Sequence, residues 1–331
     1  MEYRRLGKSG LQLSVLSLGS WVTFHKQLDD ALSDQLMGIA YDQGINFFDN
    51  AESYAGGESE KQMGRVLKNK KWDRSSLVIS SKSYFGWRGK DKKPNQWGLS
   101  RKHLVESCHE ALNRLQVDYL DLFFCHRPDR QTPIEEVVQT MNILIRQGKV
   151  LYWGTSEWSA AAIMEAHLHS VNNGLIGPTM EQPEYNLFNR YRIEREYLQL
   201  FTEYGMGATI WSPLASGMLT GKYNNGIPSE SRLALEGFEW LKDKAYAADK
   251  VEKVRQLKQV ADQLGTSLAT LSIAWCISNP LVTTAILGAT KSTQLEENLK
   301  ALDIYPRLDS GIKDTIDGIM DSRPIQPEWG F

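Results

Sequence analysis

Four side chains that could move or orient a proton follow short apolar runs along the chain. Asp49 follows INFF, Lys82 follows LVISS, His126 follows YLDLFFC, and Tyr54 lies just beyond Asp49. A neighbouring lysine cation favours a phenolate and lowers a tyrosine pKa from its usual value near ~10, so we expect Lys82 to make Tyr54 a usable proton donor. A carboxylate keeps such a lysine charged, and a histidine can orient a carbonyl oxygen. The four residue types together indicate a proton-transfer site.

Each of these residues alone is equally consistent with a helix cap, a turn or a surface ion pair. Their common position after successive apolar runs favours the site, because the carboxyl ends of parallel strands meet at one edge of a barrel. Whether these residues form one site therefore depends on the strands that carry them.

Eight apolar runs typical of buried strands recur along the chain. They start 28 to 42 residues apart, except the last, which starts 76 residues after the seventh. The stretches between them mostly carry a helical apolar period, which predicts a parallel sheet with helical crossovers. The runs begin at Val15, Ile45, Leu77, Tyr119, Leu151, Thr179, Ala208 and Thr284.

Helix boundaries can be read from capping residues. A helix with an apolar stripe is expected after Ser100. For the next helix, Thr132 is expected to cap the N-terminus and Glu135 to complete a capping box. Pro133 fits the first turn of that helix, and Gly148 marks its end.

Eight strand-helix units predict an α/β fold, a (β/α)8 TIM barrel, in a single domain over residues 1–331. An open dinucleotide-binding sheet is disfavoured because no GxGxxG follows the first run, where Gly19, Ser20 and Trp21 stand instead. The opening YRRLGKSGLQLS predicts an N-terminal β-hairpin that could plug the bottom of the barrel. LDSGIKDTIDGIMDS predicts an additional C-terminal helix.

Two long insertions, residues 83–98 and 212–249, are expected on the face where barrels carry their chemistry. The first contains the aromatic residues Tyr84, Phe85, Trp87 and Trp97, which could roof a substrate pocket or merely form a loop core. Its basic residues could steer phosphorylated aldehydes or could simply be solvated.

Composition excludes several classes of function. The chain has 38 basic and 40 acidic residues and a net charge of −2, which disfavours a nucleic-acid partner. No apolar run approaches the ~20 residues that span a bilayer, and no signal peptide is evident, so we expect no membrane insertion and a cytoplasmic location. The three cysteines lack CxxC spacing, and we expect neither disulfides nor a metal site.

Motifs along nearly the whole chain resemble the aldo-keto reductases, in the branch of potassium-channel β subunits and their bacterial reductase relatives. They include FFDNAESYAGGESEKQMGRVL, YLDLFFCHRPD, GTSEWS, EQPEYNLFNR, WSPLASGMLTGKY and LGATKSTQLEENLKAL, in family order. The resemblance implies a catalytic tetrad of Asp49, Tyr54, Lys82 and His126, with Tyr54 as the general acid.

The resemblance also implies an NADPH/NADP+ site. Ser156 and Gln182 would hold the nicotinamide carboxamide, Trp211 would stack on its ring, and Ser20 and Trp21 would line the pocket near the reacting centre. The implied cofactor contacts are Ser20, Trp21, Asp49, Ser156, Gln182, Trp211, Ser212, Pro213, Leu214, Ser216, Lys222, Arg232, Gly288, Thr290, Gln294, Glu297 and Asn298.

The helix expected after Thr290 and Lys291 supports the phosphate end of this assignment, because Ser292 could cap it and its free N–H groups would attract anions. Two positions depart from the family pattern. Glu157 stands where relatives often carry Asn or Arg, so a cofactor contact there is doubtful. Gln294 replaces the arginine that many reductases place on the 2′-phosphate.

The sequence thus leaves two functions open. The first is NADPH-dependent reduction of aldehydes or ketones to alcohols on a small-molecule carbonyl substrate. The alternative is a nucleotide-bound regulatory β subunit of a potassium channel. His126 favours the enzyme, since the resemblance implies asparagine there in channel subunits. The same branch implies a possible homotetramer.

Overall fold

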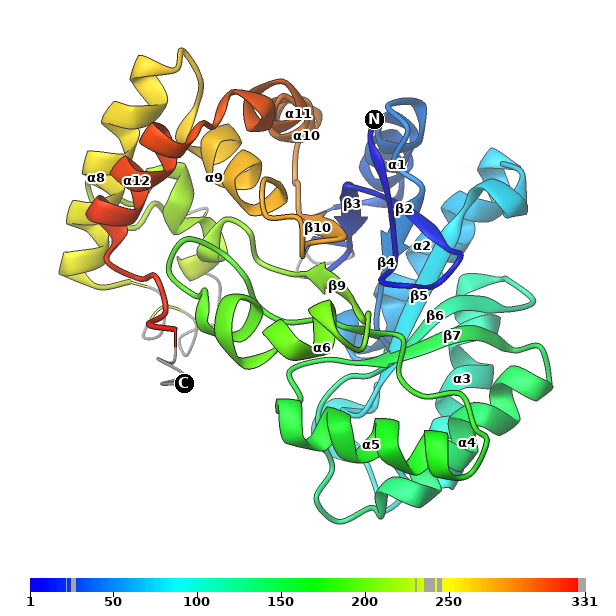
Figure 1. The fold of residues 1–331 in the computed structure, drawn as a ribbon. Coiled ribbons are helices and arrows are strands. Elements are labelled where there is room, and N and C mark those ends of the chain that lie inside the picture. The colour runs from blue at the N-terminus through cyan, green and yellow to red at the C-terminus, as the bar shows by residue number, and fades with distance from the viewer. Residues whose placement is uncertain (22, 25–27, 230, 235–241, 243–245, 327–331) are drawn as a thin grey trace, which may run out of the picture.

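The centre of the molecule is a closed barrel of eight parallel strands, in the order β10-β3-β4-β5-β6-β7-β8-β9 (Figure 1). The structure is a computed structural model and describes residues 1–21, 23–24, 28–229, 231–234, 242 and 246–326. The strands are β3 (Leu16–Gly19), β4 (Phe47–Asp49), β5 (Val78–Ser83), β6 (Leu120–Cys125), β7 (Val150–Thr155), β8 (Met180–Glu181), β9 (Gly207–Ile210) and β10 (Thr284–Leu287). The expected (β/α)8 barrel is confirmed, and each strand begins within two residues of its predicted run.

Helices that follow successive strands pack side by side around the barrel, as α3, α4 and α5 do in Figure 1. In chain order the helices are α1 (Asp30–Asp42), α2 (Glu58–Lys70), α3 (Arg101–Leu115), α4 (Ile134–Arg146), α5 (Ala160–Asn172), α6 (Leu198–Thr202), α8 (Ala248–Gln263), α9 (Leu268–Ile277), α10 (Ser292–Leu299), α11 (Ala301–Ile304) and α12 (Ser310–Met320). The expected C-terminal helix is α12, which packs on α8.

The helix expected after Ser100 is confirmed, whereas the cap predicted for the next helix is wrong. Ser100 caps α3, as its hydroxyl accepts from the His103 N–H. Helix α4 begins one residue later than expected, with Pro133 at its N-cap and no side-chain cap. The Thr132 hydroxyl instead donates to Asp129 at 2.8 Å, so the predicted Thr132 cap and its capping box are wrong.

The pleat of each strand divides the buried side chains between two clusters. Phe47 packs inside the barrel, whereas Phe48 packs outside against the helices. In β6, Leu122 and Phe124 point inward and Phe123 points outward. This period of two determines which polar residues at the strand ends face the barrel axis.

The N-terminal hairpin closes the bottom of the barrel, as expected. Its strands β1 (Tyr3–Arg5) and β2 (Gln12–Ser14) pair antiparallel. Leu6 and Leu13 are fully buried in the cluster inside the barrel. At Gly7, φ is +58° and a Cβ would lie 2.2 Å from the Gly205 carbonyl oxygen, so only glycine permits this close approach.

Across the described residues, no helix combines the length and the apolar character that crossing a membrane requires.

Candidate active site

The inward-facing pattern of each strand continues to the polar residues at its carboxyl end. Phe47 is followed two residues later by Asp49, and Met180 by Gln182. Val78 leads through Ser80 to Lys82 in the same way. His126 follows Leu122 and Phe124 at the same period. The alternation that builds the barrel core therefore aims these side chains at one mouth.

Tyr54 comes from a tight turn after β4. The turn spans Tyr54–Gly57, and Ala55, Gly56 and Gly57 have φ values of 49°, 64° and 85°. A left-handed alanine is a strained conformation that the surrounding structure must hold in place. The turn leads directly into α2 and directs the Tyr54 hydroxyl back toward Lys82.

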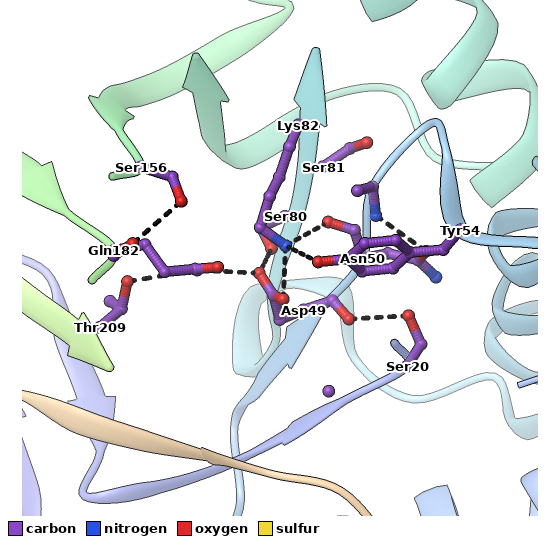
Figure 2. Close-up of polar contacts among 12 residues, drawn as sticks. Ser20, Asp49, Asn50, Tyr54, Ser80, Ser81, Lys82, Ser156, Gln182 and Thr209 are labelled. Carbon is purple, nitrogen blue, oxygen red and sulfur yellow. Dashed lines mark hydrogen bonds and ion pairs between the residues drawn. The ribbon is translucent and has the colours of Figure 1, made fainter. Parts of the chain in front are cut away.

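A chain of hydrogen bonds joins three members of the expected tetrad (Figure 2). The Lys82 ammonium donates to Asp49 Oδ2 at 2.5 Å, to the Asn50 carbonyl oxygen at 2.7 Å and to the Tyr54 hydroxyl at 3.2 Å. An ammonium has three donors, and all three are used here. Because the phenol oxygen accepts from Lys82, its own proton is left for another acceptor.

Further contacts hold Asp49 in position. Its Oδ1 accepts from the Ser80 hydroxyl at 2.8 Å and from Gln182 Nε2 at 3.3 Å. Its main-chain oxygen accepts from the Ser20 hydroxyl at 3.0 Å (Figure 2). Lys82 and Asp49 are almost completely buried, so this network keeps a buried ion pair fully hydrogen-bonded.

The acidity of Tyr54 differs from the sequence-based expectation. Burial and the nearby Asp49 charge raise the pKa of Tyr54 well above its usual value. Burial also lowers the pKa of Lys82, an effect that Asp49 opposes. The predicted lowering of the tyrosine pKa is therefore wrong, because desolvation and the Asp49 charge outweigh the lowering by the Arg127 charge. Tyr54 remains protonated at neutral pH, which is the form that can donate.

His126 forms the wall beside the tyrosine. Its ring packs edge-on to the Tyr54 ring, with centroids 5.8 Å apart. Burial, together with the charges of Lys82 and Arg127, holds the pKa of His126 well below its usual value. Its Nδ1 is buried and has no hydrogen-bond partner among the described residues. The imidazole is therefore neutral, with one nitrogen a donor and the other an acceptor.

A cavity of about 940 Å³ lies over the tetrad and extends toward α10. Tyr54, Asp49 and His126 line it, whereas Lys82 lies beneath its floor. The predicted cofactor residues among its lining are Trp21, Asp49, Ser156, Gln182, Trp211, Ser212, Pro213, Leu214, Ser216, Lys222, Gly288, Thr290, Gln294, Glu297 and Asn298.

Two of the predicted cofactor contacts are not among these lining residues. Ser20 is fully buried and uses its hydroxyl to hold the end of β4, so it is not part of the cavity surface described here. Arg232 begins a short 3-10 helix, Arg232–Ala234, but its side chain lies outside the described part of the structure.

The loop after β9 is a tight turn with several left-handed residues. Ser212, Ala215, Ser216 and Gly217 have φ values of 56°, 46°, 57° and 92°. The Ser212 hydroxyl accepts from the Ser216 N–H at 3.1 Å, which closes the turn. The Ala215 and Gly217 N–H groups donate to the Ser212 and Leu214 carbonyl oxygens at 2.9 and 2.8 Å, so these N–H groups are satisfied within the turn.

Glu157 supports Trp211 at the start of this loop. Glu157 Oε1 accepts from Trp211 Nε1 at 3.0 Å and from the Glu184 N–H at 2.6 Å. The indole of Trp211 packs edge-on to Trp21, with centroids 5.8 Å apart. Glu157 is outside the cavity lining of the described residues, in keeping with the doubt about a direct cofactor contact there.

The far end of the cavity differs in detail from the prediction. Helix α10 begins at Ser292 with Lys291 as its N-cap and without a side-chain cap, so the predicted Ser292 cap is wrong. Gln294 Oε1 accepts from the Thr290 N–H at 2.9 Å and from its hydroxyl at 3.1 Å. The Thr290 N–H is therefore satisfied within the protein rather than free for an anion.

Sequence reasoning missed several lining residues. Ser267 and Ala269 reach the cavity from the start of α9, for which no local signal exists. Arg127 could have been found, because it directly follows His126 at the end of β6. Of the four aromatic residues of the 83–98 insertion, Phe85 lines the described cavity, and its ring packs edge-on to His126 at 5.1 Å.

Comparison with known proteins identifies the family. The model of the Aldo/keto reductase family matches residues 15–320. A protein of Arabidopsis thaliana named "Probable voltage-gated potassium channel subunit beta" is 50% identical over 329 residues, covering 99% of both chains. A protein of the same name from Oryza sativa subsp. japonica matches equally well, at 50% over 329 residues. With the family model matching nearly the whole barrel, the chain belongs to the aldo/keto reductase family.

Proposed function

We propose that the protein reduces aldehydes or ketones to alcohols with NADPH. Aldo/keto reductases are oxidoreductases that generally bind NAD(P)H. The observation that carries the proposal is the hydrogen-bonded chain from Asp49 through Lys82 to Tyr54, which ends at the floor of the cavity. A protonated phenol at that point can supply the proton that carbonyl reduction requires.

The chemistry of the cavity fits the cofactor. A nicotinamide dinucleotide has an aromatic ring with a carboxamide at one end and phosphates at the other. The cavity offers Gln182, Ser156 and the indole of Trp211 near the tetrad, and Ser212, Ser216 and Lys222 farther along. These residues would hold NADPH, which when bound supplies the hydride.

The chain's own residues would supply the proton and orient the substrate. Lys82 holds the Tyr54 oxygen by a hydrogen bond and stabilises the phenolate that remains after the proton has moved to the carbonyl oxygen. The neutral His126 can donate a hydrogen bond to the same oxygen from the cavity wall. Phe85 and Trp21 would limit access of water to this point.

The test is NADPH consumption, followed by its absorbance, with 4-nitrobenzaldehyde and purified protein. Turnover that depends on both enzyme and aldehyde supports the proposal, and the Tyr54→Phe variant gives the background rate. Binding of NADPH without turnover of any aldehyde or ketone in a broad panel would contradict it.

The relatives' names support a second function, a nucleotide-bound regulatory β subunit of a potassium channel. Under that function the same cavity would bind nucleotide without needing rapid turnover. A cytoplasmic location and a homotetramer are compatible with either function. The aldehyde assay separates the two, because only the reductase must consume NADPH at a rate that Tyr54 controls.

A further inference from the structure

Arg127 is a cation in the wall of the cavity, next to the reacting centre. It directly follows His126, is partly buried, and lines the cavity together with Tyr54, His126 and Phe85. Its guanidinium lies 5.6 Å from the centre of the Phe85 ring. Its position is thus at the tetrad end of the cavity rather than at the α10 end.

Within the described part of the protein, only the Nη1 atom of this guanidinium makes hydrogen bonds. Arg127 Nη1 donates to the His126 carbonyl oxygen at 2.5 Å and lies 3.4 Å from the Ser156 hydroxyl. Among the described residues, Nε and Nη2 make no hydrogen bond and no Asp or Glu forms an ion pair with Arg127. The free edge formed by Nε and Nη2 has the geometry that binds two oxygens of one oxyanion.

Two other partly buried arginines are neutralised by carboxylates. Arg114 pairs with Glu60 at 2.6 Å, and Arg190 pairs with Asp317 at 2.6 Å. Arg127 instead repels the positive charge of its neighbours, since its own charge helps to lower the pKa values of both Lys82 and His126. A partly desolvated cation beside another cation favours an anion from outside the protein.

We propose that Arg127 selects carbonyl substrates that carry an oxyanion, a carboxylate or a phosphate, and binds that group while the carbonyl lies at Tyr54. The inference rests on the proposed reductase function and narrows its substrate class. A neutral carbonyl compound would leave the Nε and Nη2 edge without a partner, so it would bind less well.

The experiment compares two aldehydes that differ in charge but little in shape, 4-formylbenzoate and methyl 4-formylbenzoate. We expect the wild-type protein to prefer the anion in kcat/KM by about tenfold or more, as for a charge-assisted hydrogen bond. In Arg127→Met the ratio of the two kcat/KM values should fall about 10- to 100-fold. Arg127→Lys, which keeps the charge but loses the fork, should retain part of the preference.

The matched control is Arg130→Met, which removes an exposed cation from the same loop and outside the described cavity lining. In Arg130→Met the ratio of the two kcat/KM values should equal that of the wild type. If long-range electrostatic steering caused the preference, the ratio would fall in both Arg130→Met and Arg127→Met. A third aldehyde, 4-formylphenyl phosphate, separates the two oxyanions: the one with the higher kcat/KM identifies the group that fits.

Two results would overturn the inference. One is equal wild-type kcat/KM for anion and ester. The other is an equal loss for both aldehydes in Arg127→Met, which would assign Arg127 a merely structural role. If no aldehyde is turned over, the proposed function fails, and binding still decides the inference. Tryptophan fluorescence titration with 4-(hydroxymethyl)benzoate and with its methyl ester should then show tighter binding of the anion, lost in Arg127→Met.

Discussion

At the scale of single residues, the candidate site holds a protonated tyrosine beside a lysine cation. Burial raises the pKa of Tyr54, and in the proposed reaction the Lys82 hydrogen bond would give stabilisation that grows as negative charge develops on the phenol oxygen. Asp49 and the Asn50 carbonyl occupy the other two Lys82 donors. The ammonium is therefore already oriented, and in the proposed reaction it would not have to reorganise.

Tyr54→Phe should reduce kcat about 10² to 10⁴-fold, because it removes the donated proton and leaves the ring in place. Lys82→Met should reduce kcat in the same direction. Since Lys82 acts through Tyr54, the double variant should be hardly slower than the worse single variant. Steady-state rates with 4-nitrobenzaldehyde measure this, and cofactor fluorescence provides the control that NADPH still binds. Losses that multiply would show that the two residues act independently.

A second prediction concerns the buried carboxyl of Glu181, which the mechanism does not use. Met180 and Gln182 face the barrel axis, so Glu181 faces outward, where the Thr155 hydroxyl donates to it. Burial raises its pKa from 4.5 to about 8. Between these two values the unfolded chain is ionised while the folded protein keeps its proton. Stability from this group is therefore complete below pH 4.5 and is lost as the pH rises to about 8.

Glu181→Gln lacks that titration, so its unfolding free energy should fall less than that of the wild type between pH 5 and pH 8. Urea unfolding at the two pH values measures the difference. Glu165→Gln, at an exposed position on α5, is the matched control and should follow the wild type. Parallel pH profiles for wild type and Glu181→Gln would contradict the assignment.

At the scale of elements, strands were predictable from sequence and helix ends were less so. A short apolar run is enough to predict a buried strand. The period of two along that strand then predicts that Asp49, Lys82 and His126 face inward. Caps depend on competing partners. Thr132 bonds to Asp129 instead of the helix, and no local pattern could foretell the choice. The Tyr54 pKa was unpredictable for a similar reason, since burial depends on the whole fold.

The carboxylate of Glu52 anchors the first residues of the 83–98 insertion. Glu52 Oε1 accepts from the Tyr84 and Gly86 N–H groups, each at 2.8 Å, and lies 3.1 Å from His103 Nε2. Phe85 lies between the two anchored residues and lines the cavity. Glu52 is thus a positioning residue for the part of the loop that contacts the site.

Glu52→Ala should loosen this loop, because the buried Gly86 N–H and the partly buried Tyr84 N–H lose their acceptor, at about 1–3 kcal/mol for a buried unsatisfied group. The loop contains Arg88, Lys90, Lys92 and Lys93, so limited trypsin digestion should cut there faster in the variant. KM for aldehydes should rise at the same time. Glu52→Gln keeps an acceptor oxygen and should resist trypsin nearly as well as the wild type. Unchanged cleavage in Glu52→Ala would mean that other contacts hold the loop.

At the scale of the whole molecule, the barrel separates the candidate site from the packed end that the hairpin closes. The tetrad and cavity lie at the carboxyl ends of the strands, and the hairpin covers the opposite end. Arg4 ties that hairpin to the end of α9 and beyond, donating to the Val282 carbonyl oxygen at 2.7 Å and to that of Ile277 at 2.9 Å. Changes at the hairpin should therefore affect folding and leave the site intact.

Leu13→Ala tests this separation. Leu13 is fully buried inside the barrel beside Leu6 and Phe47, and a buried Leu→Ala change costs about 2–5 kcal/mol of unfolding free energy. Tm should fall by several degrees, whereas kcat/KM at a temperature well below Tm should stay near the wild-type value. The control Leu168→Ala removes a leucine that is 53% exposed on α5 and should change neither quantity much. A loss of kcat/KM in Leu13→Ala comparable to its loss of stability would show that the packing at the bottom of the barrel is transmitted to the strand ends, and that the two faces are energetically coupled.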